Sequence, residues 1–399
     1  MTGLDGQDWL TSRATAAVFD ALEAAGGPDC ARFVGGCVRN ALVGRPVDDI
    51  DVATRLKPGD SMAALKAAGI KVVPTGLAHG TVTAVSGRKP YEITTLRRDV
   101  ETDGRRAVVA FTDDWAEDAA RRDFRLNALY ADRTGAIFDP TGQGVADALA
   151  GRVVFVGDPK TRIEEDYLRI LRFFRFFAWY GRSDPDAAGL AACAAHADGL
   201  TRLSAERVSK ELMKLLAAPD PRPAVHGMRD AGVLDRLFPA VGDLAPFDAI
   251  CEAGDDPVLR LSTLLPDDPA AVAEIARGLR LPRAVETRLV AAAAGPLDPA
   301  TDAVTLRALI YRLGKQAIRD RIQRGDAVRP EAATTEALAL IDGWPVPRLP
   351  VGGRDLAKLG IEPGPETGRL LKAFEAEWIA GDFPTDGHQE RLSRLAARS

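Results

Sequence analysis

The chain is poor in the residue types on which several common classes of protein depend. Its 399 residues include only four histidines and four cysteines, the latter being Cys30, Cys37, Cys193 and Cys251. The cysteines are scattered without paired spacing, which argues against a disulfide framework or a zinc site and favours reduced thiols in the cytoplasm. The sequence has neither a basic-then-apolar leader pattern nor an apolar run as long as a membrane span, so we expect no membrane contact.

An excess of positive charge is also missing. The chain has 52 Lys and Arg residues against 57 Asp and Glu residues, which gives a formal net charge of −5. A uniformly basic coat for nucleic acids is therefore excluded, and any contact with RNA must come from local basic patches.

Apolar residues are plentiful, at 46% of the chain, and the length predicts two to four domains. Residues 30–156 mix short helical patterns with β-rich runs, and we expect strands at 82–85, 91–95, 129–131 and 153–156. From about residue 160 onward the pattern is helical. We predict five segments, namely an N-terminal helix (1–26), a mixed α/β head (27–157), a helical neck (158–220), a helical body (221–345) and a helical tail (346–399).

Two aspartates one residue apart, Asp49 and Asp51, form the most informative feature. They alternate with Ile50 and Val52, which is the period of a β-strand, so we expect both carboxylates on one face of one strand. Two like charges this close repel unless a cation lies between them, and hard divalent cations prefer oxygen ligands. The pattern predicts a metal site, with Glu92 on a later strand as a candidate third carboxylate.

A glycine turn precedes this pair. Residues 32–34 are predicted to form a strand that breaks at Gly35 and Gly36, and residues 37–43 to form a short helix. A glycine turn that opens a helix presents backbone N–H groups to an anion such as phosphate. A phosphate cradle beside a metal-holding carboxylate pair predicts a nucleotidyl-transfer site.

The order strand, Gly-Gly, helix, short loop and Asp-x-Asp strand resembles the class II nucleotidyltransferase superfamily, which includes tRNA CCA-adding enzymes and bacterial poly(A) polymerases. The family pattern is Gly-Gly-x-Val-Arg-Asp, Leu, Gly-Arg and Asp-x-Asp, and Asn40 replaces its first Asp here. The resemblance covers nearly the whole chain. It implies an α+β fold, with a mixed-sheet, polymerase-β-like nucleotidyltransferase head followed by an all-α neck, body and tail. It also implies Mg²⁺ at Asp49 and Asp51 and a nucleotide contact for Arg39.

A second motif, Arg-Arg-Asp-Phe-Arg-Leu-Asn-Ala, begins at Arg121 and closely matches the family's Arg-Arg-Asp-Phe-Thr-x-Asn-Ala, with Arg125 in place of Thr. Arg121 and Arg122 offer forked donors suited to a triphosphate. Asp123 can accept a hydrogen bond from a ribose 2′-hydroxyl, and Asn127 can bridge to sugar or phosphate. Such a cluster alone is usually a set of ion pairs; beside the aspartate pair we interpret it as a nucleotide contact.

The choice of base is predicted to depend on Asp166 and Arg169, which we expect one turn apart on one helix. Ionised Asp only accepts hydrogen bonds and Arg only donates them, a combination that suits the pairing edges of C and A and opposes those of G and U. The family's Glu-Asp-x-x-Arg motif falls on these residues and implies this templating role. An ordinary salt bridge is the alternative. The charged loop 97–110 resembles the family's flexible loop and is a candidate mobile element for distinguishing C from A.

Contacts with RNA are expected beyond the head. Arg172 and Arg175 lie among aromatic residues, and Arg207 and Lys210 share one face of a later helix. The expected partners are tRNA, at its 3′ end and by family analogy its elbow, together with CTP and ATP. No protein partner is inferred.

The predicted activity is template-independent addition of C, C and A to the 3′ end of tRNA, by two-metal attack of the 3′-hydroxyl on the α-phosphate of CTP or ATP. A poly(A) polymerase, or an enzyme that adds only A or only CC, would share every motif of the head. The alternative from another class is a non-catalytic RNA-binding protein on a transferase fold. The presence of the acidic pair and both arginines argues against that alternative.

Overall fold

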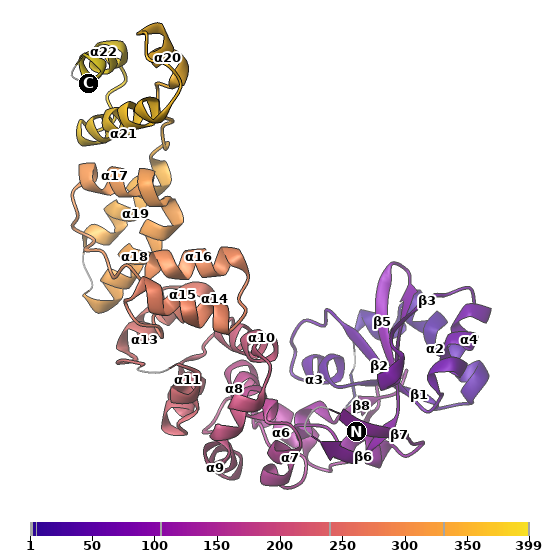
Figure 1. Cartoon of the computed structure of the whole chain (residues 1–399). Helices are drawn as coiled ribbons and strands as arrows, with labels where there is room; N and C mark the ends of the chain where they lie inside the picture. The colour runs from indigo at the N-terminus through magenta and orange to yellow at the C-terminus, as the bar shows by residue number, and fades with distance from the viewer. Residues whose placement is uncertain (1–2, 5, 104–105, 239–240, 330–331, 398–399) are drawn as a thin grey trace. The chain divides into compact units, whose positions relative to one another are not determined.

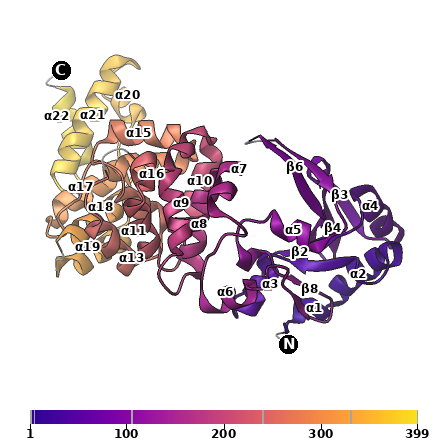
Figure 2. The same ribbon diagram turned by 90° about the horizontal axis from the view of Figure 1, so that it is seen from below.

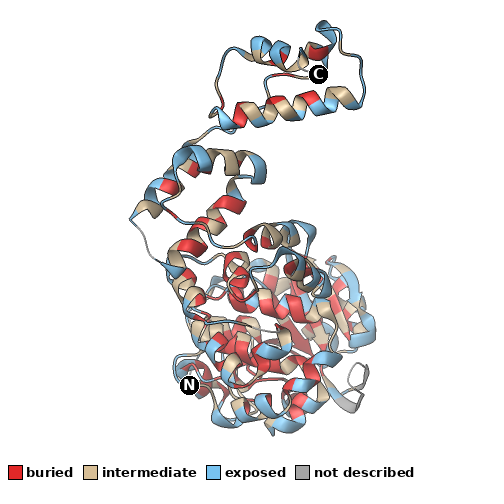
Figure 3. Cartoon of the chain, turned by 60° about the vertical axis from the view of Figure 1, so that its left-hand side comes forward, coloured by how far each residue is buried: buried red, intermediate tan, exposed pale blue. Residues whose placement is uncertain are grey.

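The computed structural model describes residues 3–4, 6–103, 106–238, 241–329 and 332–397. Within 99–109 it describes the backbone and not the side chains. The chain divides into two compact units, Met1–Pro239 and Ala240–Ser399 (Figure 1). Each unit has buried residues of its own (Figure 3). In the part of the chain that the structure describes, no helix is long and apolar enough to cross a membrane.

A mixed seven-stranded sheet is the centre of the first unit, with the strand order β3–β4–β5–β2–β1–β8–β9. β2 and β5 run parallel, and the other neighbours are antiparallel. The strands are β1 (Ala31–Val34), β2 (Ile50–Thr54), β3 (Lys71–Gly76), β4 (Thr81–Ser86), β5 (Lys89–Thr95), β8 (Tyr130–Ala131) and β9 (Ile137–Phe138). A separate two-stranded ribbon consists of β6 (Arg97–Asp103) and β7 (Arg106–Phe111).

Helices cover the sheet because its strands carry apolar residues on alternate positions. Residues along β4 alternate between partly exposed and buried, as expected for a strand with one covered face. α2 (Arg13–Gly26) and α4 (Pro58–Ala67) pack against each other and against β4, as Figure 2 shows. The remaining helices of this part are α1 (Asp8–Thr11), α3 (Gly36–Leu42), α5 (Trp115–Ala120) and α6 (Gly144–Ala150).

The rest of the described chain is helical. The first unit continues with α7 (Pro159–Glu165), α8 (Leu168–Tyr180), α9 (Ala187–Ala195), α10 (Ala205–Leu216), α11 (Arg222–Asp230) and α12 (Val233–Leu237). The second unit contains α13 (Ala245–Ala253), α14 (Pro257–Ser262), α15 (Pro269–Gly278), α16 (Arg283–Ala292), α17 (Ala303–Leu313), α18 (Lys315–Val328), α19 (Ala333–Gly343), α20 (Gly353–Lys358), α21 (Pro365–Ala380) and α22 (His388–Ala396). Short 3₁₀ turns occur at Leu77–His79, Arg125–Asn127 and Ala197–Arg202.

The predicted fold class, a mixed-sheet head followed by helices, is confirmed, whereas two predicted elements are wrong. The strand expected at 153–156 is reduced to one bridge between Phe124 and Phe155, because this segment pairs only with the short turn before η2 (Arg125–Asn127). The single helix expected over 1–26 is broken at Ser12, whose hydroxyl accepts from the Thr15 N–H at 3.2 Å and so caps α2. The division of the helical part into neck, body and tail stays a prediction.

Candidate active site

A cavity of about 520 Å³ in the first unit collects most of the predicted nucleotide-binding residues. It is lined by Gly35, Gly36, Arg39, Asp51, Arg122, Asp123, Asn127, Arg172, Arg175, Phe176, Trp179, Tyr180 and Lys214. Five of these side chains are cationic and two are carboxylates, although the chain as a whole is acidic. The cavity therefore favours an anionic ligand.

Asp51 supplies a carboxylate to this cavity from strand β2. The strand begins at Ile50, so Asp49 lies immediately before it and is not among the lining residues. The parallel pairing of β2 with β5 places Glu92 directly beside Asp51. Burial and then the charge of Glu92 raise the pKa of Asp51 to about 6, with Asp49 adding to the effect and Arg122 opposing it.

The surroundings of Asp51 fit a hard divalent cation. Its carboxylate oxygens are suitable ligands. The negative charges of Glu92 and Asp49 repel the ionised carboxylate of Asp51, and a bound cation would relieve this repulsion. Over the described residues, however, no group of three or more His, Cys, Asp or Glu side chains is arranged to hold a metal ion. The roles of Asp49 and Glu92 as ligands stay predictions.

The glycine turn lies against the arginine motif. Gly35 has φ +69° and ψ −117° and precedes the first residue of α3, a backbone conformation that other residues rarely adopt. A Cβ atom at Gly35 would lie 3.5 Å from Nη1 of Arg122 and 3.7 Å from the Asn127 carbonyl oxygen. A side chain here would fill the space between the turn and the guanidinium, so the turn and Arg122 converge on one part of the cavity.

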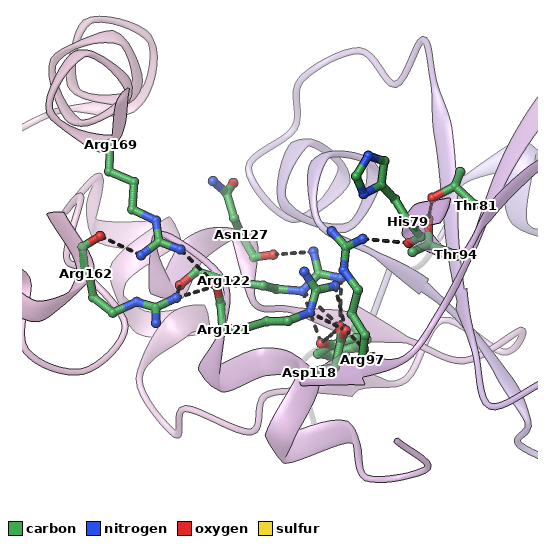
Figure 4. A network of polar contacts seen from close by, with 11 residues as sticks. His79, Thr81, Thr94, Arg97, Asp118, Arg121, Arg122, Asn127, Arg162 and Arg169 are labelled. Atoms are coloured by element: carbon green, nitrogen blue, oxygen red, sulfur yellow. Dashed lines mark hydrogen bonds and ion pairs between the residues drawn. The ribbon is translucent and has the colours of Figure 1, made fainter. Parts of the chain in front are cut away.

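Arg121 and Arg122 are both held by Asp118, a buried residue of α5 (Figure 4). One carboxylate oxygen of Asp118 accepts from Arg121 at 2.7 and 2.9 Å, and the other accepts from Arg122 at 3.0 and 3.3 Å. Arg122 lines the cavity whereas Arg121 does not. The backbone carbonyls of both arginines accept from Arg162, and that of Arg121 also accepts from Arg169.

Arg39 lines the cavity as a buried cation, and its hydrogen-bond partners are neutral side chains. It donates to the side-chain oxygen of Asn127, to Oδ1 of Asn40 at 2.8 Å and to the Tyr180 hydroxyl at 2.7 Å. Its guanidinium also lies over the ring of Tyr180, 4.1 Å from the centroid. Asn40, the departure from the family pattern, donates to the Pro46 carbonyl at 2.9 Å and so holds the loop that leads to Asp49.

Several predicted contact residues are bonded to one another. Asp123 accepts from Arg172, from Asn127 at 3.0 Å and from the Phe124 N–H at 2.8 Å. Burial alone would raise the pKa of Asp123, but Arg172 and these hydrogen bonds lower it to about 2. Arg175 forms an ion pair with Glu211, with 2.8 Å between Nε of Arg175 and Oε2 of Glu211. The predicted ribose and RNA contacts of Asp123, Arg172 and Arg175 stay predictions.

The expectation that Asp166 and Arg169 share one helix is wrong. Asp166 is the extended residue between α7 and α8, where its carboxylate accepts from the Leu168 N–H at 3.1 Å and from Arg207 at 2.6 Å. Arg169 instead donates to the Glu165 carboxylate and, at 2.6 Å, to the backbone carbonyl of Arg162. The helix breaks here because the Asp166 side chain bonds to the backbone two residues ahead, which competes with helical hydrogen bonding.

The other predicted residues lie outside the cavity lining. Neither Asp166 nor Arg169 lines it, and Arg207 and Lys210 of α10 do not either. Their roles in base choice and RNA binding stay predictions. Of the proposed mobile element 97–110, residues 104 and 105 lie outside the described residues, and the backbone on either side forms the β6–β7 ribbon.

Four residues that line the cavity, and Asp118 behind it, were not among the predicted site residues. Phe176, Trp179 and Tyr180 of α8 and Lys214 of α10 reach the cavity through the packing of helices far away in the sequence. Asp118 could have been found, because an acid three and four residues before two consecutive arginines is a helical ion-pair spacing. For Lys214 the only signal is its place on the same helix face as the predicted Arg207 and Lys210.

Comparisons with known proteins agree with this geometry. The family model described as the poly A polymerase head domain matches residues 31–154. The model described as a probable RNA and SrmB-binding site of polymerase A matches residues 185–244.

Relatives that match over most of the chain include CCA-adding enzymes. Human mitochondrial CCA tRNA nucleotidyltransferase 1 is 34% identical over 385 residues, covering 87% of this chain and 82% of the relative. The CCA-adding enzyme of Streptococcus gordonii is 32% identical, covering 92% of this chain and 93% of the relative. The crystal structure of the Bacillus stearothermophilus CCA-adding enzyme in complex with CTP has the same fold, with a TM-score of 0.77 at 24% identity over 97% of this chain and 99% of that one.

Proposed function

This chain belongs to the CCA tRNA nucleotidyltransferase family, and we propose that it adds C, C and A to the 3′ end of tRNA from CTP and ATP. The basic cavity supports this most directly, because the glycine turn, Asp51 and Arg122 meet there. A triphosphate carries the negative charge that such a cavity favours. We also propose a location in the cytoplasm, which the four free thiols support.

In the proposed reaction the 3′ oxygen of the tRNA forms a bond to the α-phosphorus of the nucleotide, and the bond from that phosphorus to pyrophosphate breaks. Arg122 and Arg39 compensate the negative charge of the triphosphate. Gly35 leaves room for the phosphates beside Arg122. Asp123, which lines the cavity, is proposed to contact the ribose after exchanging one of its present bonds.

Asp51, together with Asp49, is proposed to hold Mg²⁺. When bound, the ion neutralises charge on phosphate oxygens and lowers the pKa of a hydroxyl that it contacts. Glu92, the neighbour of Asp51 on the adjacent strand, is proposed as a third carboxylate, since three carboxylates can hold the two ions of the proposed mechanism.

Extension of a tRNA that lacks its 3′ CCA tests the proposed function. With CTP and ATP supplied together, we expect products that end in CCA, and sequencing them separates this activity from poly(A) synthesis and from A-only or CC-only addition. Absence of any labelled nucleotide in the product would favour the non-catalytic RNA-binding alternative.

Replacement of the cavity carboxylate tests the site. We expect Asp51→Ala to reduce nucleotide incorporation at least about 100-fold, because a ligand is lost for the Mg²⁺ that would neutralise charge on the phosphate oxygens. The affinity for tRNA should stay nearly unchanged. Asp60→Ala is the matched control, since Asp60 is an exposed acid on α4 of the same head. Comparable loss of incorporation and of tRNA binding in Asp51→Ala would contradict the metal role.

A further inference from the structure

Asp118 accepts hydrogen bonds from both arginines of the second motif, and it is almost completely buried, with 1% exposed. Two guanidinium groups share its single carboxylate. The cluster therefore keeps one net positive charge, so these ion pairs do not neutralise the arginines. That remaining charge is available to an anion in the cavity.

The carboxylate itself is fixed from two further elements. The Tyr130 hydroxyl of β8 donates to it at 2.7 Å, and the backbone N–H of Arg97, at the start of β6, donates at 3.3 Å. Although burial opposes it, the two arginines and Tyr130 lower the pKa of Asp118 to about 2, so the group is charged at neutral pH. A charged group held on several sides is a rigid anchor.

The anchor determines where Arg122 points. α5 ends at Ala120, so Arg122 lies beyond the helix and its side chain is directed by its bonds rather than by helix geometry. Nε donates to Asp118 and to the Tyr130 hydroxyl, at 3.3 and 3.1 Å, and Nη2 donates to Asp118. Nη1 donates to the Asn127 carbonyl oxygen at 3.5 Å and faces the glycine turn, 3.5 Å from the position of a Cβ atom on Gly35.

We propose that Asp118 is a positioning residue for nucleotide binding, which holds the Arg122 guanidinium in the orientation that grips the triphosphate beside Gly35. The proposal rests on the proposed function for the identity of the ligand. It assigns Asp118 no contact with the substrate, because the cavity lining contains Arg122 and not Asp118.

The test is Asp118→Asn, which keeps the shape of the side chain and removes its charge. We expect the Kd and KM values for CTP and ATP to rise about tenfold or more. The kcat should change less than about threefold, and the KM for tRNA should stay the same, since a positioning role acts on nucleotide binding. The effects of Asp118→Asn and Arg122→Ala on the nucleotide Kd should be non-additive, because the two residues act as one unit.

Asp147→Asn is the matched control. Asp147 is buried to the same extent, and it also pairs with two arginines, Arg152 at 2.9 Å and Arg125 at 3.6 Å. None of these three residues lines the cavity. We expect both variants to lower the melting temperature, and only Asp118→Asn to weaken nucleotide binding. Equal loss of stability with unchanged nucleotide constants in Asp118→Asn would overturn the proposal.

A milder variant covers the case in which Asp118→Asn does not fold. Tyr130→Phe removes one donor to Asp118 and one acceptor for Arg122, and we expect a rise of about threefold in the nucleotide Kd. An unchanged Kd in a folded Tyr130→Phe would also count against the proposal. The Kd for CTP, measured by calorimetry without tRNA, separates the two proposals. If the wild type binds CTP but extends no tRNA, the proposed function is wrong. The CTP Kd values of the variants still decide the role of Asp118 in that case.

Discussion

Asp51 is a cavity residue whose surroundings oppose its negative charge. Its pKa is raised to about 6 by burial and by Glu92, so its protonated form is favoured in the folded protein more than in the unfolded chain. A raised pKa gives stability that is fully present below pH 3.8 and is lost as the pH rises through about 6. Without metal, the ionised carboxylate at pH 7 is therefore a destabilising group, and a cation would relieve it.

Two measurements follow for this residue. In EDTA at pH 7.5 we expect Asp51→Asn to melt a few degrees higher than the wild type, and this difference should shrink as the pH falls below 6 and vanish only below about pH 3.8. Binding of Mn²⁺ to the wild type should weaken by about tenfold for each pH unit below 6, because protons compete for the same oxygens. A lower melting temperature of Asp51→Asn at pH 7.5 in EDTA would contradict the strained carboxylate.

Local spacing was enough to predict the cavity residues that belong to short sequence motifs. Gly35, Asp51 and Arg122 belong to motifs whose turn, strand and helix end are set by neighbouring residues, and all three line the cavity. Tyr180 and Lys214 reach it only through the packing of α8 and α10, which a local pattern does not encode. Asp166 and Arg169 have helical spacing, but the bond from Asp166 to the Leu168 N–H replaces the expected turn of helix.

Strand prediction depended on the same distinction between local and distant partners. β4 and β5 are joined by a tight hairpin and were predicted from their own residues. β9 has two residues and exists through its pairing with β8, and β3 is mostly exposed. The predicted run at 153–156 is apolar enough for a strand, yet no strand of the sheet pairs with it among the described residues. Pairing partners, rather than composition, decided these cases.

The junction between α7 and α8 is where choice among nucleotides is predicted to lie. Arg207 of α10 binds Asp166 at 2.6 Å, so the orientation of this carboxylate depends on a second helix. We expect Asp166→Ala to reduce discrimination against G and U by about tenfold, because an acceptor for the exocyclic amine is lost. Arg207→Ala, which only frees the carboxylate, should reduce it less. Competition among all four nucleotides at equal concentration measures the effect.

Glu164→Ala is the control for this junction, because Glu164 is an exposed acid of α7 two residues earlier. It should leave the choice of nucleotide as it is in the wild type. If Asp166→Ala incorporates the four nucleotides in wild-type proportions, the templating role is wrong and the Asp166–Arg207 contact is a structural ion pair.

At the scale of the whole chain, the candidate active-site cavity lies in one unit, and much of the helical scaffold belongs to the other. Every residue that lines the cavity lies between positions 35 and 214, inside the unit Met1–Pro239. The second unit has apolar clusters of its own, one around Ile310 and Ile341 and one around Phe374 and Trp378. Each unit therefore has the buried apolar core that independent folding requires.

A fragment that ends at residue 239 tests this separation. We expect it to bind CTP and ATP with a Kd within about threefold of the full chain, because no cavity residue is removed. Its affinity for tRNA should fall at least about tenfold at the same salt concentration if the second unit supplies phosphate contacts, as the predicted tail site implies. Removal of residues 346–399 alone is a poorer experiment, since Tyr311 and Trp344 pack against the tail cluster and would be exposed. Full tRNA affinity in the fragment would place the RNA contacts on the first unit, and loss of CTP binding would show that the cavity needs the second unit to form.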